Sequence, residues 1–487
     1  MSAATSVPTQ PVVHEVNTAL WLADLGRALG RPVTLGDVPD DAWDAVVRPG
    51  VDAVWLMGVW ERSTAGLALV DPGTRRTFRE ALPDLRPGDV IGSPYCVRRY
   101  EVDERFGGRA GLTHARAALA RRGALLVLDY VPNHVAPDHP WVLEHPELVL
   151  RGDPGDDPAA RLAVGDRVVA RGRDPYFPPW PDVVQLDAFS PALRAATAET
   201  LAGIAEQCDG IRCDMAMLPT NDVFARTWHD RAGPPPDTDF WPDVFGELRI
   251  RHPDVLMIAE AYWDMEWALQ QQGFDLCYDK RLYDRLIGLD VDGVRAHLRA
   301  DRAYQSRLIR FLENHDEPRV ASELPREALR AAAVVLATLP GGTLWHEGQF
   351  EGRRTRPPVF LTRAPDEPVD TELAAWHHDL LGVAPAVRTG TWQLLEVTGW
   401  PDNQTCSHLL AWSWTAPGSR HLVVVNLSPT PSQGRVRSPW DADGPTRLSD
   451  VLRTETFYRD GAELAAEGLY VALPPWGHHV LEVAPGR

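Results

Sequence analysis

Cysteine is scarce in this chain, and its distribution excludes two kinds of structure. The 487 residues include only five cysteines, a small and odd number. They are widely spaced, at Cys96, Cys208, Cys213, Cys277 and Cys406. The set has neither the paired spacing of a zinc site nor the density of a disulfide framework, so we expect a reducing, cytoplasmic compartment.

Long apolar runs and an excess of positive charge are also missing. No stretch of 18 apolar residues occurs, which argues against a membrane span. Residues 1–11 are small and polar without a charged segment followed by an apolar one, so we expect no signal peptide. The formal net charge is −19, and nucleic-acid binding needs a basic face. The expected partner is therefore a small ligand rather than a nucleic acid or a membrane.

Short motifs of several common enzyme classes are absent as well. The chain has no Gly-x-Ser-x-Gly of serine hydrolases, no His-Glu-x-x-His of zinc proteases and no Gly-x-x-x-x-Gly-Lys phosphate loop. The stretch 106–111 is rich in glycine but has neither the spacing of Gly-x-Gly-x-x-Gly nor a strand before it. The alternative fold is an open, doubly wound sheet, and the absence of its usual phosphate-binding motif makes it less well supported.

What the sequence does contain is eight apolar runs that alternate with helical patterns. The predicted strands begin at Val12, Val51, Ala124, Gly210, Asp254, Gly273, Leu308 and Thr343. Strands that alternate with helices indicate a parallel sheet, and eight such units over about 350 residues fit a (β/α)8 TIM barrel. Among the helices, the pattern predicts one over 113–122 with Thr113 as its N-cap, and another that Ser190 caps.

Composition divides the chain into three parts. Residues 1–134 and 190–387 carry the barrel pattern. Residues 135–189 are rich in Pro, Gly and Asp, and a loop of this length inside a compact domain is usually functional. Residues 388–487 hold short, partly alternating runs between turn residues, which predicts a C-terminal antiparallel β-sandwich domain.

Four of the predicted strands end in charged or polar side chains. The run 210–218 contains Arg212 and Asp214, which share one face of a strand because residues i and i+2 point to the same side. Burying two charges costs several kcal/mol unless they pair with each other or serve a function. A structural ion pair is therefore one interpretation, and a functional site is the other. Glu260 and Asp316 end two other apolar runs in the same way. In a parallel barrel the carboxyl ends of all strands meet at one mouth, where active sites lie.

Taken together, these strand ends resemble glycoside hydrolase family 13, the α-amylase superfamily. The matching segments are Asp129-Tyr-Val-Pro-Asn133-His134, Gly210-Ile-Arg212-Cys-Asp214, Met-Ile-Ala-Glu260 and Asn314-His315-Asp316. They occur in the family's order on predicted strands three, four, five and seven. The resemblance also covers the segment after strand three, which corresponds to the family's domain B, and the C-terminal domain.

The resemblance implies a role for each of these side chains. Asp214 would be the nucleophile, with Arg212 keeping it ionised, and Glu260 would be the general acid and then the base. Asp316 would stabilise the oxocarbenium-like state. We expect the first two carboxyls to lie about 5–5.5 Å apart, as in retaining enzymes. The substrate-binding residues would be Tyr95, Asp129, His134, Arg212 and His315. Tyr100 competes with Tyr95 for the position under the reacting sugar.

The implied function is a retaining α-glycoside hydrolase that acts on oligosaccharides or small α-glucosides through a covalent glycosyl-aspartate. An α-glucosyl transferase (transglycosylase) with the same site is the alternative, and a catalytically silent sugar-binding or scaffold barrel is the alternative from another class. Many amylases carry Lys-His where this chain has Met217-Leu218, which favours a small substrate.

Three aromatic residues and one asparagine complete the prediction. Trp180, Trp263 and Phe177 are candidates to line further sugar subsites, although packing is an equally good interpretation. Asn133 matches a position that often binds calcium in the family, and it is a possible calcium ligand here. No other metal ligand or cofactor is predicted, and the sequence indicates no oligomeric state.

Overall fold

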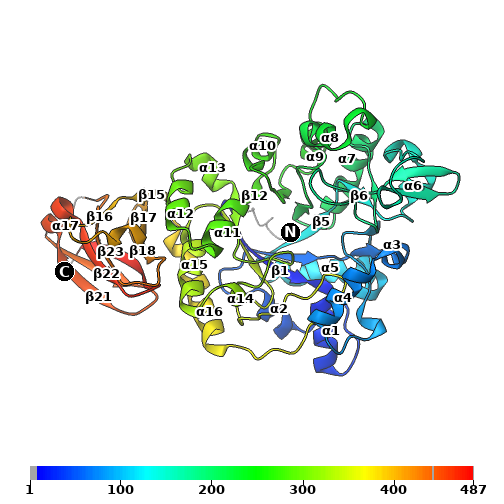
Figure 1. The fold of residues 1–487 in the computed structure, drawn as a ribbon. Helices are drawn as coiled ribbons and strands as arrows, with labels where there is room; N and C mark the ends of the chain where they lie inside the picture. Colours follow the sequence, from blue (N-terminus) through cyan, green and yellow to red (C-terminus); the bar gives the residue numbers. More distant parts are fainter. Residues whose placement is uncertain (1–7, 441–443, 486–487) are drawn as a thin grey trace.

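The centre of the molecule is a closed barrel of eight parallel strands (Figure 1). The computed structural model describes residues 8–440 and 444–485. The barrel strands are β1 (Val12–Asn17), β2 (Ala53–Met57), β5 (Leu125–Tyr130), β10 (Gly210–Cys213), β11 (Leu256–Ala259), β12 (Leu276–Tyr278), β13 (Leu308–Arg310) and β14 (Gly342–His346). They follow one another around the barrel in chain order, and β14 pairs with β1 to close it. All eight predicted strands and the (β/α)8 barrel are therefore confirmed.

Helices surround the barrel between successive strands. They are α1 (Thr18–Leu29), α2 (Asp40–Val46), α5 (Gly108–Ala120), α7 (Pro191–Ala205), α8 (Asn221–Trp228), α9 (Phe240–Arg251), α10 (Glu266–Gln271), α11 (Lys280–Ile287), α12 (Val291–His297), α13 (Arg302–Ser306), α14 (Val320–Glu323), α15 (Arg326–Thr338) and α16 (Thr371–Val387). Ser190 caps α7 as predicted, because its hydroxyl accepts from the backbone N–H of Leu193 at 3.4 Å.

The predicted start of α5 is wrong. This helix begins at Gly108, and its N-cap is Gly107 in a left-handed conformation with φ of 100°. Thr113 lies inside the helix, where its hydroxyl donates to the carbonyl of Arg109 at 2.9 Å. A threonine can satisfy its hydroxyl in this way within a helix, so a capping residue type does not by itself mark a helix start.

The two faces of the barrel strands belong to different cores. Val12, Val54 and Leu126 pack in the large core that also contains residues of the surrounding helices. Their neighbours Val13 and Trp55 belong to a separate cluster that is drawn almost entirely from barrel strands. Because successive side chains of a strand point to opposite faces, this second cluster fills the barrel interior.

Loops that follow two barrel strands build walls above the barrel mouth. After β2 the chain forms α3 (Thr64–Leu69), α4 (Pro72–Ala81) and the antiparallel pair β3 (Trp60–Arg62) and β4 (Val97–Val102). After β5 it forms α6 (Pro140–Glu144), the pair β6 (His134–Val135) and β9 (Val184–Gln185), and the pair β7 (Arg161–Val164) and β8 (Arg167–Ala170). The second of these segments occupies the position of domain B in the resemblance.

The C-terminal part of the chain forms two antiparallel sheets, as predicted. One contains β15 (Thr391–Leu395), β17 (Leu409–Ala416), β18 (Ser419–Asn426), β23 (His478–Pro485), β20 (Pro445–Asp450) and β21 (Thr456–Asp460). The other contains β16 (Val397–Thr398), β19 (Ser432–Val436) and β22 (Leu469–Leu473), and α17 (Gly461–Glu467) precedes β22. Figure 1 shows these sheets beside the barrel, next to α12, α13 and α15.

Alternating residues of β17 connect the two sheets and the barrel. Leu409 and Ala411 pack between the two sheets, whereas Trp412 and Trp414 belong to the main core. The indole N–H of Trp414 donates to the carbonyl of Thr338 on α15 at 2.7 Å, and the guanidinium of Arg302 lies 5.6 Å from its ring centroid.

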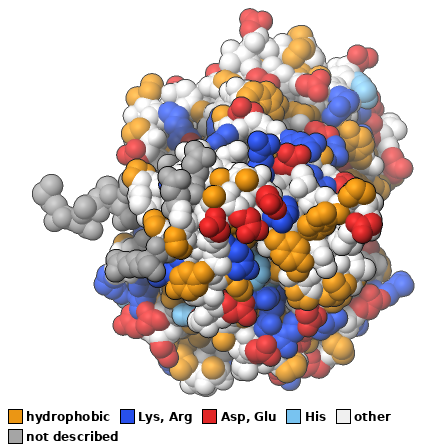
Figure 2. All heavy atoms as spheres, turned by 90° about the vertical axis from the view of Figure 1, so that its left-hand side faces the viewer, with side chains coloured by type: hydrophobic (Ala, Val, Ile, Leu, Met, Phe, Trp, Pro, Cys, Tyr) orange, Lys and Arg blue, Asp and Glu red, His pale blue; other side chains and the backbone are white. Residues whose placement is uncertain are grey.

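Among the described residues, no helix has both the length and the apolar character that a bilayer span requires. On the face of the C-terminal sheets, basic and acidic side chains are mixed with small apolar patches (Figure 2). A mixture of this kind is ordinary for the surface of a folded domain.

We expect Trp414→Ala to lower the free energy of unfolding by about 3–5 kcal/mol, because it removes a fully buried indole and its hydrogen bond between the C-terminal sheet and α15. Denaturant or thermal unfolding measures this. Tyr458→Ala is the matched control, since Tyr458 lies on β21 with 60% of its surface exposed and should change stability little. Equal losses in the two variants would contradict the interface described here.

Candidate active site

A cavity of about 460 Å³ opens at the mouth of the barrel. Asp214, Glu260 and Asp316 line it from the ends of β10, β11 and β13, so the structure brings the three predicted catalytic residues together. The loops above contribute Tyr95 and His134. The three rim aromatics predicted from the sequence, Phe177, Trp180 and Trp263, also line the cavity.

Arg212 lies beneath this cavity and contacts its acidic residues. Its Nη1 donates to Oδ1 of Asp214 at 2.7 Å, and its Nη2 lies 2.8 Å from Oε2 of Glu260. The two carboxyls therefore sit side by side on the two terminal nitrogens of one guanidinium. Aromatic rings surround the cation: the centroid of Trp55 is 5.0 Å and that of Tyr95 is 5.4 Å from Cζ. Only 1% of Arg212 is exposed, so the charge is almost completely removed from water.

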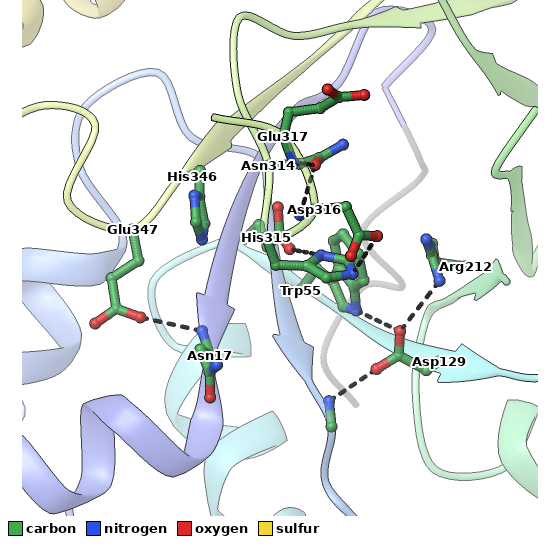
Figure 3. Close-up of polar contacts among 12 residues, drawn as sticks. Asn17, Trp55, Asp129, Arg212, Asn314, His315, Asp316, Glu317, His346 and Glu347 are labelled. Atoms are coloured by element: carbon green, nitrogen blue, oxygen red, sulfur yellow. Dashed lines mark hydrogen bonds and ion pairs between the residues drawn. The ribbon is translucent and has the colours of Figure 1, made fainter. Parts of the chain in front are cut away.

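Asp129 lies behind Arg212 rather than in the cavity wall. Its Oδ1 is 4.0 Å from Nη1 of Arg212 and accepts from the indole N–H of Trp55 at 3.1 Å, while Oδ2 accepts from the backbone N–H of Gly58 at 2.8 Å (Figure 3). With these partners Asp129 orients Arg212 and the end of β2. Of the five predicted substrate-binding residues, Tyr95 and His134 line the cavity, whereas Asp129, Arg212 and His315 stand behind it.

Burial and neighbouring charges separate the protonation of the acids. Burial, together with the charges of Asp214 and Asp316, raises the pKa of Glu260 to about 7, although Arg212 opposes this rise. Burial also raises the pKa of Asp214 above its ordinary value despite the ion pair with Arg212. Arg212 acts in the expected direction, because its charge and its hydrogen bond lower the pKa of Asp214 against the effect of burial.

Glu260 is held by groups that the sequence motifs did not include. Its Oε2 accepts from the backbone N–H of Met215 at 2.6 Å, and its Oε1 accepts from the hydroxyl of Tyr262 at 3.1 Å. Met215 adopts a positive φ of 43°, which is uncommon outside glycine and asparagine and turns its N–H toward the carboxyl. Backbone strain of this kind is often found at functional sites.

Asp316 is ionised by its histidine neighbour. Its Oδ2 lies 3.0 Å from Nε2 of His315, and half of its side-chain surface is exposed to the cavity. The charge of His315 and the hydrogen bond from it lower the pKa of Asp316 to about 2, even though burial acts in the opposite direction. Asp316 is therefore an anion at any physiological pH.

The aromatic ring at the base of the cavity is Tyr95. Its ring stacks on His315 with centroids 5.3 Å apart, and its hydroxyl lies 2.8 Å from Nε2 of that histidine. Tyr100, the competing candidate, packs on Tyr130, and its hydroxyl donates to the carbonyl of Val131 at 3.2 Å. The structure thus places Tyr95, and not Tyr100, at the cavity.

At the rim, aromatic side chains of the insertion meet the loop after β11. The rings of Tyr176 and Trp263 contact edge to face with centroids 4.9 Å apart. Trp263 has a positive φ of 60°, and its side chain lines the same cavity as Glu260. Met217 and Leu218, which replace the Lys-His pair, are buried in the core and do not line the cavity.

Several residues of this site could not be assigned from the motifs alone. They are Glu15, Trp55, Met215 and Tyr262. Glu15 did leave a signal, because it is a charged residue inside the apolar run 12–17. The other three are apolar or aromatic residues whose function comes from a backbone N–H, an indole N–H or a hydroxyl.

The surroundings of Asn133 do not fit a calcium ion. The side-chain amide nitrogen of Gln185 donates to the backbone oxygen of Asn133 at 2.9 Å, to its Oδ1 at 2.9 Å and to the carbonyl of Leu186 at 3.0 Å. Calcium needs six to eight oxygen ligands, usually with carboxylates among them. In the described part of the chain no group of three or more His, Cys, Asp or Glu could hold a metal ion. The side-chain amide of Gln185 thus lies between the two oxygens of Asn133, in the position that a calcium ion would need.

Comparisons with known proteins agree with this geometry. No protein-family model matches the chain. It is 26% identical over 433 residues to the alpha-amylase MalA of Haloarcula japonica, a match that covers 86% of this chain and 56% of that protein. Its fold superposes on a noncanonic maltogenic alpha-amylase, AmyB from Thermotoga neapolitana, with a TM-score of 0.69 and 20% identity over 97% of this chain and 98% of that one. The resemblance to glycoside hydrolase family 13 is confirmed.

A second kind of family 13 relative is a transferase. Over 295 residues the chain is 26% identical to the alpha-1,4-glucan:maltose-1-phosphate maltosyltransferase of Burkholderia pseudomallei, covering 57% of this chain and 22% of that protein. The chain thus spans about half the length of the amylase relative and a quarter or less of this transferase.

We expect a chelator to leave the thermal unfolding midpoint unchanged, because Gln185 rather than a metal satisfies the oxygens of Asn133 and Leu186. Gln185→Ala should lower the free energy of unfolding by about 1–3 kcal/mol, since these buried acceptors lose their donor. Differential scanning calorimetry with and without EDTA checks both. A midpoint that falls with EDTA and recovers with calcium would contradict this assignment.

Proposed function

We propose that the chain is a retaining α-glycosidase or transglycosylase that acts on α-glucosidic bonds. The observation that carries this proposal is the arrangement around Arg212, in which one buried guanidinium contacts two adjacent carboxyls. Glu260 has a pKa of about 7 and can still be protonated at neutral pH, while Asp214 pairs with a cation through one oxygen. Two carboxyls whose environments differ in this way suit the roles of general acid and nucleophile.

The first step forms a glycosyl-enzyme. Oδ1 of Asp214 is bound to Arg212, so Oδ2 is the oxygen that attacks the anomeric carbon. As the glycosidic bond breaks, Glu260 gives its proton to the leaving oxygen. Oε2 of Glu260 already accepts from Met215 and faces Arg212, so the proton resides on Oε1. That oxygen also contacts the hydroxyl of Tyr262, which orients it.

The second step releases the sugar. Glu260 is now a carboxylate and removes a proton from the incoming hydroxyl, whose oxygen attacks the anomeric carbon and displaces Asp214. The incoming group is water in hydrolysis and a sugar hydroxyl in transfer. Both outcomes use one intermediate, and relatives of both kinds support the pair of activities: an alpha-amylase and a maltosyltransferase.

The remaining residues serve binding and charge stabilisation. Asp316 remains ionised and exposed to the cavity, which suits it to hold sugar hydroxyls and to stabilise positive charge on the ring. Burial lowers the pKa of His134 to about 4, so its neutral ring can bond a hydroxyl without adding charge. Tyr95 offers a ring face for the sugar. With all three acids in one cavity, a silent scaffold barrel is the weaker interpretation.

The substrate class follows from the cavity and its rim. Phe177, Trp180 and Trp263 provide apolar surface for a few sugar rings, and the buried Met217-Leu218 pair offers no polar contact beyond them. We therefore expect short α-gluco-oligosaccharides or small α-glucosides. The five cysteines are free and buried, which supports a reducing, cytoplasmic compartment. A panel of α-glucosides and α-glucosyl phosphates, with product analysis, separates hydrolysis from transfer.

Glu260→Gln should lower kcat on unactivated α-glucosides by about 10²–10⁴-fold, because the leaving oxygen loses its proton donor. With an aryl α-glucoside whose phenol leaves without protonation, formation of the intermediate should be largely restored in this variant. Asp214→Asn is the control, since it lacks the nucleophile and should stay inactive on both substrates. Equal losses of Glu260→Gln on the two substrates would contradict the acid role.

The pH dependence of kcat/KM should be bell-shaped. Activity rises with pH as Asp214 ionises, from a pKa above its ordinary value, and falls as Glu260 loses its proton at a pKa of about 7. Initial rates across pH 4–9 measure both limbs. Glu260→Gln should abolish the alkaline limb on the activated aryl substrate; an alkaline limb that persists in this variant would assign that ionisation to another group.

A further inference from the structure

Glu15 is a carboxylate buried in the middle of a barrel strand. It belongs to β1 and lies between Trp55 of β2 and His346 of β14 in the barrel register. Glu15 and Val13 are two residues apart in β1, so their side chains point to the same face of the strand. Val13 belongs to the cluster that fills the barrel interior, so Glu15 also points into it. None of its surface is exposed. An ionised carboxylate in such a place costs several kcal/mol unless other groups compensate it.

The compensation for Glu15 comes through a single contact. Oε1 of Glu15 lies 2.5 Å from Nδ1 of His315, whereas no described residue gives Oε2 a hydrogen bond. On the other side of the same ring, Nε2 of His315 faces the hydroxyl of Tyr95 at 2.8 Å and Oδ2 of Asp316 at 3.0 Å. His315 therefore connects a buried carboxylate to two residues that line the cavity. Figure 3 shows His315 beside Asp316.

The charges around His315 favour a ring that is protonated on both nitrogens. Glu15 and Asp316 face its two edges as anions, and together they raise its pKa well above the ordinary value despite its burial. The other charged or titratable groups nearby are Tyr95, Asp129, Arg212 and His346. Of these, Arg212 opposes protonation and Asp129 supports it, while burial keeps His346 and Tyr95 neutral. A doubly protonated ring donates from both nitrogens, which fixes its orientation.

We propose that Glu15 is a positioning residue that acts through His315 to hold Asp316 and Tyr95 in place beneath the reacting sugar. The inference rests on the proposed function, because it concerns the same cavity. Glu15 itself does not line the cavity, so its effect must pass through the ring. A buried carboxylate with one oxygen unpartnered is a poor choice for stability alone, since an apolar or amide side chain would fill the space at lower cost.

A double-mutant cycle tests whether Glu15 acts through His315. The variants are Glu15→Gln, His315→Asn and the pair, and the readouts are kcat and KM on one α-glucoside. Misplacement by about 1 Å can cost about 100-fold, so we expect Glu15→Gln to lower kcat on that order with KM changed little. In the His315→Asn background the same substitution should change kcat less than threefold, on the order of the error of a cycle. Additive losses would overturn the proposal.

The pH dependence of kcat/KM separates this role from a purely structural one, because a structural role of Glu15 would not change the pH at which activity falls. In the wild type Glu260 sets the alkaline limb of kcat/KM, because the raised pKa of His315 keeps that ring protonated. Without the Glu15 charge we expect the pKa of His315 to fall below that of Glu260, so the alkaline limb should move to lower pH in Glu15→Gln. The shift should disappear when His315 is replaced too. Glu15→Asp keeps the charge but withdraws it from Nδ1, so it should lower kcat while the alkaline limb stays close to that of the wild type.

The control is Glu347→Gln. Glu347 is a half-buried carboxyl directly after β14, and its Oε2 accepts from the backbone N–H of Asn17 at 3.1 Å rather than from His315 (Figure 3). This variant should keep the wild-type kcat and alkaline limb, and a matching shift would overturn the assignment to Glu15. Unfolding midpoints show whether each variant is folded.

A wild-type chain without turnover of any α-glucoside would overturn the proposed function and this role together, whereas turnover with an additive cycle overturns the role of Glu15 alone.

Discussion

The arrangement of this site depends on one buried guanidinium. Arg212 receives Asp214 on one terminal nitrogen and Glu260 on the other, and Asp129 supports it from behind. These four residues come from three adjacent strands, β5, β10 and β11, so the ion cluster also joins the part of the barrel that carries the acids. Such a cluster is costly in a core, and breaking it by removing one partner leaves uncompensated charge. Its presence is therefore better explained by chemistry than by stability.

Burial and ion pairing give the carboxyl groups around the cavity different pKa values. Glu260 lines the cavity and has a pKa of about 7, so it is partly protonated at neutral pH, while Asp316 is anionic because His315 supplies a positive charge. His315 can do so because Glu15 lies on its other edge. In the function that we propose, the three carboxyl groups around this cavity serve as acid, nucleophile and charge stabiliser, and the surrounding barrel determines which group has which role.

The sequence predicted most of the fold and the three acids, and physical reasons explain what it missed. Apolar runs of parallel strands are nearly continuous, so the eight strands stood out. Asp214 and Glu260 follow β10 and β11 directly, and Asp316 lies in the loop after β13. The start of α5 was wrong because a left-handed Gly107 caps it and Thr113 bonds within the helix. Met215 and Gln185 act through contacts that form only when the chain folds. The contact of Met215 uses its backbone N–H, which every residue except proline has, so the residue type does not reveal it.

The most direct test of this account is to trap the covalent intermediate. A fluorinated α-glucosyl fluoride forms the glycosyl-enzyme but slows its breakdown, so the sugar stays attached long enough for peptide mapping by mass spectrometry. The account predicts one added glycosyl group, on the peptide that contains residues 210–218, with fragmentation placing it on Asp214. A label on another carboxylate, or turnover of the reagent with inversion at the anomeric carbon and no label, would contradict it.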